Sequence, residues 1–527
     1  MKKIVSLFLS LIILTSLTGC EFLDTLKGEY EESTEEMTEG AVPPPEISNS
    51  ISMGIIDYDT FNPLITTSET VKETLELVYE PLFDIDEKMR PVPVLAESYT
   101  VSPDGRTFEI KLRTDVTWHD GTRFTALDAA YTLKQVKTGI TAYTDHAINI
   151  ADYTGIDDDK LRITLNYAVP DFVTLLTFPI VKYGTNMSGS GDFTPVGTGP
   201  FQYNSHPTSG RILFTAYDGY HGGRAQIDSV TVHVIPGLDK YKSMFEASEI
   251  DLMTGDTVDL SEYSPRGSAN VNEYTTNRLT YLGFNTQNPL FTGANTRKGI
   301  SKLIDKDNIV NSVIYSRGIA VDAPINPSSI YYYDINTKFR RDELTAASLL
   351  GDDGWGTNGD GDYERKVGGS KQILSFTILT DSDNAEKTAV ANKMAEMFNE
   401  FGIGAKVTAV PYDEYRNRVN TMDFDVVVDE ILLPPNNDLS MLISSAGNSF
   451  GYVNTDLDTL VGQMGITYDE EQLKELYRQY GAAVTDEMPF VALFFWKGIV
   501  MSGAKLKTPV IPSITRHFRN VNEWRVK

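Results

Sequence analysis

The most regular pattern of apolar and polar residues lies in the C-terminal half of the chain. An apolar run at 373–379 precedes a helical pattern over 384–401. A short strand pattern at 406–410 follows, and after a further helical stretch comes the apolar run 424–428. Strands joined through helices favour parallel pairing with right-handed crossovers. We therefore expect an α/β unit in this half of the chain.

The segment 384–401 has the features of an amphipathic helix. Asp383 and Glu386 give it a cap-like start, and Gly402 follows its last turn, where a glycine commonly ends a helix. Its apolar residues recur at helical spacing: Val390, Met394, Met397, Phe398 and Phe401. These side chains are expected to pack against the neighbouring strands.

A different pattern marks residues 107–113. Apolar and charged residues alternate strictly there, after a Pro-Asp-Gly turn at 103–105. Alternation of this kind predicts a strand with one face buried and the other exposed. We expect this strand to belong to a smaller mixed subdomain.

The first twenty residues resemble the export signal of a bacterial lipoprotein. Lys2 and Lys3 precede an apolar run at 4–17, which is too short for a comfortable membrane span. Cys20, the only cysteine in the chain, directly follows Gly19, as in the lipobox where the thiol receives diacylglycerol before cleavage. The resemblance implies a mature chain without disulfides. Cys20 is the expected lipid attachment site of the mature chain. Its lipid is expected to anchor the protein on the extracytoplasmic face of the cell membrane.

Composition narrows the classes of partner. The formal net charge is −27, which argues against nucleic acid and anionic lipid headgroups as partners.

Residues 21–46 hold nine acidic residues and one lysine, and this stretch closes on three prolines, so 20–47 is expected to be a disordered, extended tether. The remaining chain is longer than one hydrophobic core usually serves, so two or more lobes are expected.

Several motifs could suggest catalysis or metal binding. The stretch GNSFG at 447–451 fits the nucleophile-elbow formula around Ser449, but a loop pattern follows it where that motif needs a helix. The stretch NGDGD at 358–362 has Tyr363 where a calcium loop needs glycine, so we expect a polar turn. The six histidines lack zinc-ligand spacing. We expect no enzyme activity, no metal site and no cofactor.

A set of ordered motifs carries a specific resemblance. They are VYEPLF at 78–83, PVPVLAESY at 91–99, SPDG at 102–105, WHDG at 118–121, GTGPF at 197–201, YLGFNT at 281–286 and LIDK at 303–306. Together they are similar to the family 5 extracellular solute-binding proteins, the peptide-binding components of bacterial ABC importers. The resemblance extends from about Ile51 to the C-terminus.

The family resemblance implies an α/β, two-lobed, periplasmic-binding-protein-like fold of type II, with an extra N-terminal subdomain. Hinge-linked lobes would close around a ligand cleft. The signal would take 1–19 and the tether 20–47. The core of lobe I would combine 48–62, 192–280 and 495–527, the appended subdomain would be 63–191, and lobe II would be 281–494. Hinge strands would lie near 282–285 and 493–496.

The family resemblance also suggests which residues line the cleft. Aromatic walls bury ligand surface with few lost rotamers, and a glycine lets backbone approach closely. The candidates are Phe61, Asn62, Gly199, Tyr281, Phe284, Asn285, Phe494, Phe495 and Trp496. Ordinary core packing is the competing explanation for each aromatic residue taken singly.

One departure from the family concerns the ligand's ammonium group. Peptide-binding relatives commonly carry a tryptophan and, three residues later, an aspartate that pairs with the peptide's α-ammonium. Those positions are Ile431 and Pro434 here. A buried ammonium without its partner is costly. Either Asp429, Glu430 or Asp438 substitutes, or the ligand lacks a free ammonium.

The resulting hypothesis is a lipid-anchored receptor that captures a peptide-like solute and delivers it to the membrane subunits of an ABC permease. A same-fold alternative binds a non-peptide solute, such as a glycan fragment or a metal chelate. A second alternative is a membrane-anchored sensor or interaction protein without a transport role. A chain from Glu46 to Lys527 is expected to be a soluble monomer.

Overall fold

The computed structural model describes residues 49–526 except 140, 188–192, 206–209, 256–268 and 334–340. The expected signal at 1–19, the lipid attachment site Cys20 and the tether 20–47 therefore lie outside the described residues. The described chain from Asn49 onward belongs to one compact unit.

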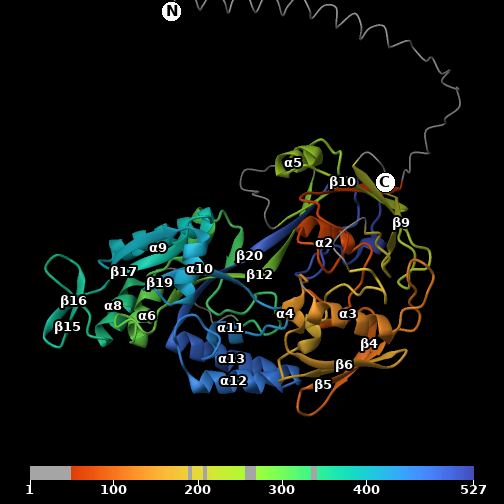
Figure 1. Ribbon diagram of the computed structural model, residues 1–527. Coiled ribbons are helices and arrows are strands. Elements are labelled where there is room, and N and C mark those ends of the chain that lie inside the picture. Colours follow the sequence, from red (N-terminus) through yellow and green to blue (C-terminus); the bar gives the residue numbers. More distant parts are fainter. Residues whose placement is uncertain are drawn as a thin grey trace, which may run out of the picture. The chain divides into compact units, whose positions relative to one another are not determined.

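One large mixed sheet dominates this unit (Figure 1). Its strands follow the order β18-β17-β19-β12-β20-β11-β1-β10-β9-β8, and β13 pairs with β20. Their bounds are β18 Gly404–Val410, β17 Ser375–Asp381, β19 Val426–Leu432, β12 Asn270–Phe284, β20 Phe490–Ser502, β11 Leu252–Thr254, β1 Ser50–Ile55, β10 Ser229–Val234, β9 Arg211–Ala216, β8 Phe201–Ser205 and β13 Gly318–Ala320.

Two hydrophobic regions separate along this sheet. The cluster that holds Ile51, Phe108 and Val500 defines what we call lobe I. Two clusters on opposite faces of the β17-β19-β12 region, one with Leu282 and the other with Tyr281, define lobe II. The fold is thus two-lobed, as expected.

Strands β12 and β20 connect the lobes. β20 pairs with β11 of lobe I through Leu252↔Ser502, and it pairs with β12 from Asn270↔Ser502 to Gly283↔Phe490. The β12–β20 register shifts twice, between Thr275 and Leu279 and between Thr280 and Tyr281. β12 begins well before the hinge segment expected at 282–285 and ends within it, and β20 extends past both ends of the segment expected at 493–496.

A four-stranded antiparallel sheet packs within lobe I. Its order is β4-β5-β7-β6, with β4 Ala96–Val101, β5 Thr107–Leu112, β7 Lys160–Leu165 and β6 Ile150–Asp157. β5 buries alternate side chains, including Phe108 and Ile110, so the half-exposed strand predicted from alternation is confirmed. These side chains share one hydrophobic cluster with β1 and β10, so the appended subdomain expected over 63–191 and the expected core of lobe I are buried together.

The α/β pattern of lobe II is also confirmed. β17 pairs in parallel with β18 and β19, and helix α9 (Ala385–Glu400) crosses between β17 and β18. Gly402 adopts φ +91° after the helix, where a Cβ atom would be strained. The N-cap is Asn384, whose side chain accepts from Lys387 N, rather than Asp383. The side-chain oxygen of an asparagine caps a helix about as well as that of an aspartate.

The remaining elements are short strands and helices. The strands are β2 Phe83–Ile85, β3 Pro91–Pro93, β14 Gly356–Thr357, β15 Tyr363–Val367 and β16 Ser370–Ile373. The helices are α2 Glu69–Leu75, α3 Ala126–Thr138, α4 Thr144–Ala147, α5 Leu238–Glu246, α6 Ala294–Lys302, α7 Lys306–Asn308, α8 Glu343–Asp352, α10 Tyr412–Asn420, α11 Ser440–Ile443, α12 Thr455–Gly465 and α13 Glu470–Glu487. Within the described ranges, no helix is both long and apolar enough to cross a bilayer.

Candidate ligand cleft

The carboxyl ends of the parallel strands in lobe II point toward lobe I. Leu432, at the end of β19, pairs with Arg278, while the preceding half of β12 runs back to lobe I. In open α/β sheets, ligands bind in the crevice outside the carboxyl ends of the strands. The space around the crossing strands is therefore where a ligand cleft is expected.

A cavity of about 400 Å³ lies beside the crossing strands. Glu273 and Lys497 line it from β12 and β20, and their side chains form an ion pair of 2.9 Å. Lobe I contributes residues that include Met89 and Ser513, and the segment around β13 contributes Ile319. The volume falls in the range of small-molecule sites.

Buried polar contacts hold the lobe I wall of this cavity in place. Asp84 accepts from Thr515 Oγ1 at 2.7 Å and from Arg519 Nε at 3.0 Å. Nearby, Tyr274 Oη lies 2.7 Å from His517 Nε2. These contacts fix the C-terminal segment against the start of lobe I and against β12.

The lobes also contact each other away from the crossing strands. Tyr331 Oη donates to Asp171 Oδ2 at 2.7 Å, and Asn436 Nδ2 donates to the Pro170 carbonyl at 3.1 Å. Burial raises the pKa of Asp171 to about 6. Two hydrogen bonds, from Tyr331 and from the loop after β19, thus join lobe II to the appended part of lobe I.

Trp496 occupies the centre of a polar cluster on the lobe II side of the crossing. Its Nε1 donates to Thr280 Oγ1 at 2.9 Å and to Glu430 Oε1 at 2.8 Å. The guanidinium carbons of Arg278 and Arg317 lie 4.6 Å and 5.5 Å from the centre of its ring. Cations at these distances are attracted to the face of an indole.

A second charged cluster surrounds Asp429. Its Oδ2 lies 3.2 Å from Arg416 Nη1 and accepts from Tyr281 Oη at 3.3 Å. Its Oδ1 lies 3.9 Å from Lys387 Nζ, which is also 3.5 Å from Asp381. Burial, followed by the neighbouring Asp429 charge, raises the pKa of Tyr281 well above its ordinary value. Arg416 and Lys387 of this chain therefore balance the negative charge of Asp429.

Comparison with known proteins identifies the family of this chain. Residues 90–452 match the model of the bacterial extracellular solute-binding proteins, family 5. The chain belongs to this family. The oligopeptide-binding protein AppA of Bacillus subtilis (strain 168) is 25% identical over 522 residues, which cover 94% of each chain. The dipeptide-binding protein of Escherichia coli (strain K12) is 24% identical over 514 residues, covering 88% of this chain and 92% of its own.

Solved structures show the same fold. The nickel ABC transporter structure from Bacillus halodurans superposes with a TM-score of 0.77 at 21% identity, covering 91% of this chain and 100% of the other. At this identity the likeness concerns the fold alone. It supports the two-lobed architecture of a family 5 solute-binding protein.

The family motif GTGPF has an internal structural role in this chain. A Cβ atom on Gly199 would lie 2.7 Å from the Leu77 carbonyl oxygen, and Gly199 N donates to the Val78 carbonyl at 2.8 Å. The buried Glu80 carboxylate accepts from Thr198 Oγ1 at 2.9 Å. We expected Gly199 to let backbone approach closely. The backbone that approaches it is that of Leu77 and Val78.

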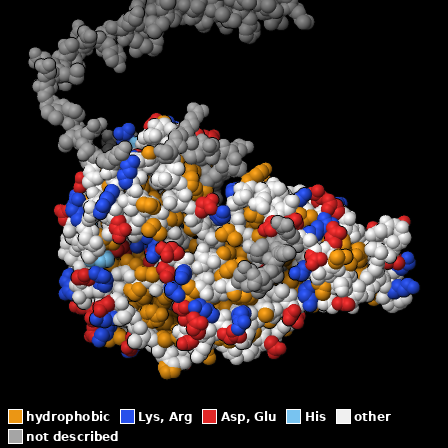
Figure 2. Space-filling model, turned by 180° about the vertical axis from the view of Figure 1, so that it is seen from behind, with side chains coloured by type: hydrophobic (Ala, Val, Ile, Leu, Met, Phe, Trp, Pro, Cys, Tyr) orange, Lys and Arg blue, Asp and Glu red, His pale blue; other side chains and the backbone are white. Residues whose placement is uncertain are grey.

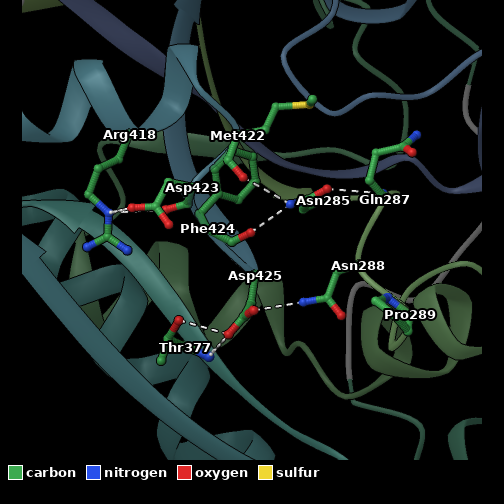
Figure 3. A pocket seen from close by; sticks show the side chains of 10 residues that line it. All are labelled: Asn285, Gln287, Asn288, Pro289, Thr377, Arg418, Met422, Asp423, Phe424 and Asp425. Carbon is green, nitrogen blue, oxygen red and sulfur yellow. Dashed lines mark hydrogen bonds and ion pairs between the residues drawn. The ribbon is translucent and has the colours of Figure 1, made fainter.

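The family motif YLGFNT ends in a surface pocket of lobe II (Figure 3). This pocket lies past Phe284, at the end of β12 opposite to the end that pairs with Ser502 of β20. Asn285 Nδ2 donates to the carbonyls of Met422 and Phe424 at 3.1 Å and 2.9 Å. Asp425 accepts from Asn288 and from Thr377 in the same pocket. The Asn285 amide therefore joins β12 to the segment before β19.

The aromatic candidates are mostly core residues. Phe284, Phe494 and Phe495 are fully buried in the clusters of lobe II. Phe61 is buried in lobe I, 6.2 Å from the Phe214 ring, and Asn62 Oδ1 accepts from Leu64 N. Only Trp496 and Tyr281 reach the polar clusters near the crossing. Their roles toward a ligand stay predictions.

The acidic candidates are engaged as well. Glu430 Oε1 accepts from both Thr280 and Trp496, and Asp438 Oδ1 accepts from Ser440 N at 2.9 Å. A ligand ammonium would have to compete with these partners.

Sequence reasoning missed the basic residues of both clusters. Arg278, Arg317, Arg416 and Lys387 belong to no recognised motif. Arg278 stands at the boundary between the polar first part and the largely apolar last part of β12, and no sequence pattern singled it out.

The motifs that could suggest other chemistry have structural explanations. Ser449 follows helix α11 rather than a strand, and Asn448 Oδ1 accepts from Phe450 N and Tyr452 N in a tight turn. Asn358 Oδ1 likewise accepts from Asp360 N and Asp362 N, which confirms the polar turn at 358–362. Within the described residues, no group of three or more histidine, cysteine or acidic side chains is arranged to hold a metal ion.

The face of the molecule drawn in Figure 2 does not resemble a nucleic-acid interface. Figure 2 shows lysine and arginine side chains interspersed with aspartate and glutamate side chains over the face drawn. Nucleic-acid binding needs a continuous basic surface.

Proposed function

We propose that this chain is the lipid-anchored, non-enzymatic substrate-binding component of an ABC importer. It captures a peptide-like solute between its lobes and delivers it to the permease. The observation that carries the proposal is the cavity beside β12 and β20, which takes wall residues from both lobes. A ligand that contacts both walls favours the closed arrangement by its differential affinity.

Two relatives support a peptide as the ligand. The Bacillus subtilis relative is named an oligopeptide-binding protein, and the Escherichia coli relative a dipeptide-binding protein. Both match this chain over most of its length, which supports a similar ligand class here.

A non-peptide solute on the same fold is the second candidate. Ile431 and Pro434 stand where relatives carry an ammonium anchor, and the chain already pairs Asp429 and Glu430. A glycan fragment or a metal chelate needs no such anchor. A solved structure of the same fold is titled a nickel ABC transporter, which supports this candidate.

The ligand class can be tested by releasing small molecules from the purified protein. The protein is isolated gently from its native host and denatured, and the released molecules are identified by mass spectrometry. Related peptides would support peptide capture. A single non-peptide species would support the second candidate, and an empty cleft would favour a sensor or interaction protein.

The lipid anchor is a separate part of the proposal. Cys20 follows the signal and is the only thiol in the chain. Labelling of cells with a palmitate analogue should mark the wild-type chain, and Cys20→Ser should remove the label and release the protein from membranes. Equal labelling of both chains would contradict the anchor. Gel filtration of a chain starting at Glu46 tests the expected monomer.

A further inference from the structure

The Asp171 side chain is directed at lobe II rather than at its own element. Asp171 stands at the N-cap position of the 3₁₀-helix η1 (Phe172–Leu175), where an aspartate commonly accepts from a backbone N–H of the first turn. It makes no such side-chain cap bond. Its Oδ2 accepts instead from Tyr331 Oη of lobe II at 2.7 Å. The carboxyl is therefore used across the boundary between the lobes.

Most of the titratable groups that face this carboxyl also belong to lobe II. They are Tyr331, Tyr468, Glu470 and Tyr477 from lobe II and Tyr99 from lobe I. Burial raises the pKa of each of these tyrosines, so they are uncharged at neutral pH. Glu470 is the charged member of the set.

Glu470 has basic partners of its own. Its carboxylate lies 2.7 Å from Lys474 Nζ and 3.2 Å from Arg90 Nη2 of lobe I. The hydrogen bond from Lys474 lowers the pKa of Glu470 below its ordinary value, so this carboxylate stays ionised at neutral and mildly acidic pH. Asp171 is thus the member of the set whose charge changes in that range.

Further contacts close the lobe boundary around Asp171. Tyr468 Oη donates to the Gly105 carbonyl, in the turn between β4 and β5, at 3.3 Å. Ile330 N donates to the Lys88 carbonyl at 3.0 Å. Helix α13, which follows Tyr468, lies beside the four-stranded sheet of lobe I (Figure 1). Separation of the lobes would withdraw these lobe II groups together and return the Asp171 carboxyl to water.

The surroundings of Asp171 couple the lobes to pH. Burial raises the pKa of Asp171 from its ordinary value of 3.8 to about 6, although the hydrogen bond from Tyr331 opposes the shift. With the lobes apart, the carboxyl is solvated and its pKa is expected near the ordinary value. The higher pKa belongs to the closed arrangement, so closure takes up a proton between these two values. Lower pH therefore favours closure.

We propose that Asp171 and Tyr331 form a proton-sensitive latch, which holds the lobes together when the carboxyl is protonated and weakens when it is ionised. The inference rests on the proposed function, because that function requires the lobes to part when a solute is released. It adds a regulation by pH to that function. The protein then retains its solute more tightly in a mildly acidic medium than near neutral pH.

The latch is tested by the distance between the lobes. Spin labels are placed on the full chain at Lys134→Cys in α3 and Asn392→Cys in α9, two exposed positions. Cys20→Ser removes the only other thiol. Pulsed electron spin resonance gives the distance distribution without added ligand. The ratio of closed to open molecules should be about tenfold higher at about pH 5 than at about pH 7.5.

Three variants of this labelled chain identify the group that titrates. Asp171→Asn should show no such pH dependence, because the amide cannot ionise, and asparagine tolerates positive φ. Asp152→Asn is the matched control at an exposed aspartate of β6 and should follow the labelled parent. Tyr331→Phe lacks the donor and should reduce the closed fraction at about pH 5. Thermal unfolding shows which chains are folded, and Tyr331→Phe decides if Asp171→Asn is not.

A second measurement relates the latch to a ligand. A mixture of tripeptides is offered to each chain at both pH values, and the retained peptides are quantified by mass spectrometry. Retention that rises about tenfold at the lower pH in the labelled parent, but not in Asp171→Asn, supports the latch. If no chain retains tripeptides while the distance still depends on pH, the peptide function fails and the latch is supported. Equal distance distributions at both pH values in the parent, or an unchanged pH dependence in Asp171→Asn, would overturn the latch.

Discussion

Tyr331 donates a hydrogen bond to the buried carboxyl of Asp171, at 2.7 Å, across the boundary between the lobes. Tyr331 packs in a hydrophobic cluster of lobe II, where its ring stacks on Tyr477 at 4.5 Å. Asp171 precedes Phe172 of the lobe I cluster and has positive φ. The contact therefore joins the two lobes away from the crossing strands, next to the hydrogen bond from Asn436 to the Pro170 carbonyl.

Loss of this hydrogen bond should loosen the lobes. Tyr331→Phe leaves the Asp171 carboxyl without a donor, which costs about 1–3 kcal/mol. We expect a larger radius of gyration in small-angle X-ray scattering than in the wild type. Tyr167→Phe, at an exposed tyrosine of lobe I, is the control and should behave as the wild type. An unchanged radius in Tyr331→Phe would show that the contact does not hold the lobes together.

Glu73 should make stability depend on pH. Burial raises its pKa from the ordinary value of 4.5 to about 7, although His517 and the hydroxyl of Thr254 oppose the shift. The folded chain then holds a proton that the unfolded chain releases, so the unfolding free energy falls as pH rises between these two values. The expected fall from this group is about 3 kcal/mol.

Glu73→Gln tests this expectation. Gln cannot ionise, so the variant should lose less stability than the wild type between about pH 5 and about pH 8. Urea unfolding at both pH values measures the difference. Parallel pH profiles for the two chains would show that Glu73 does not titrate in the folded state.

Gly197 should not tolerate a side chain. A Cβ atom there would lie 1.8 Å from the Val78 carbonyl oxygen, so Gly197→Ala must displace backbone. We expect a loss of about 3 kcal/mol in the free energy of unfolding. Gly462, inside α12, has open space around it, and Gly462→Ala should gain about 0.5–1 kcal/mol. Urea unfolding compares both variants, and a neutral Gly197→Ala would refute the close approach.

Asn285 should matter for stability rather than for ligand retention. Asn285→Ala removes two hydrogen bonds to the carbonyls of Met422 and Phe424, at a cost of about 1–2 kcal/mol. Retention of ligand should stay as in the wild type once the variant is folded. Loss of ligand from an Asn285→Ala variant of unchanged stability would show that Asn285 contacts the ligand.

The sequence by itself determined the local elements and the family. The alternation at 107–113, the helical spacing from Val390 to Phe398 and the glycine after α9 depend on neighbours within a few residues, so they can be recognised without the fold. The ordered motifs identified the two-lobed architecture. They could not show what each motif residue contacts.

Only the tertiary structure decided the partners of the candidate site. Asp429 meets Lys387 and Arg416, and Gly199 meets Leu77, across long stretches of chain. Such contacts depend on how β12, β19 and β20 are placed in one sheet, which no local pattern specifies.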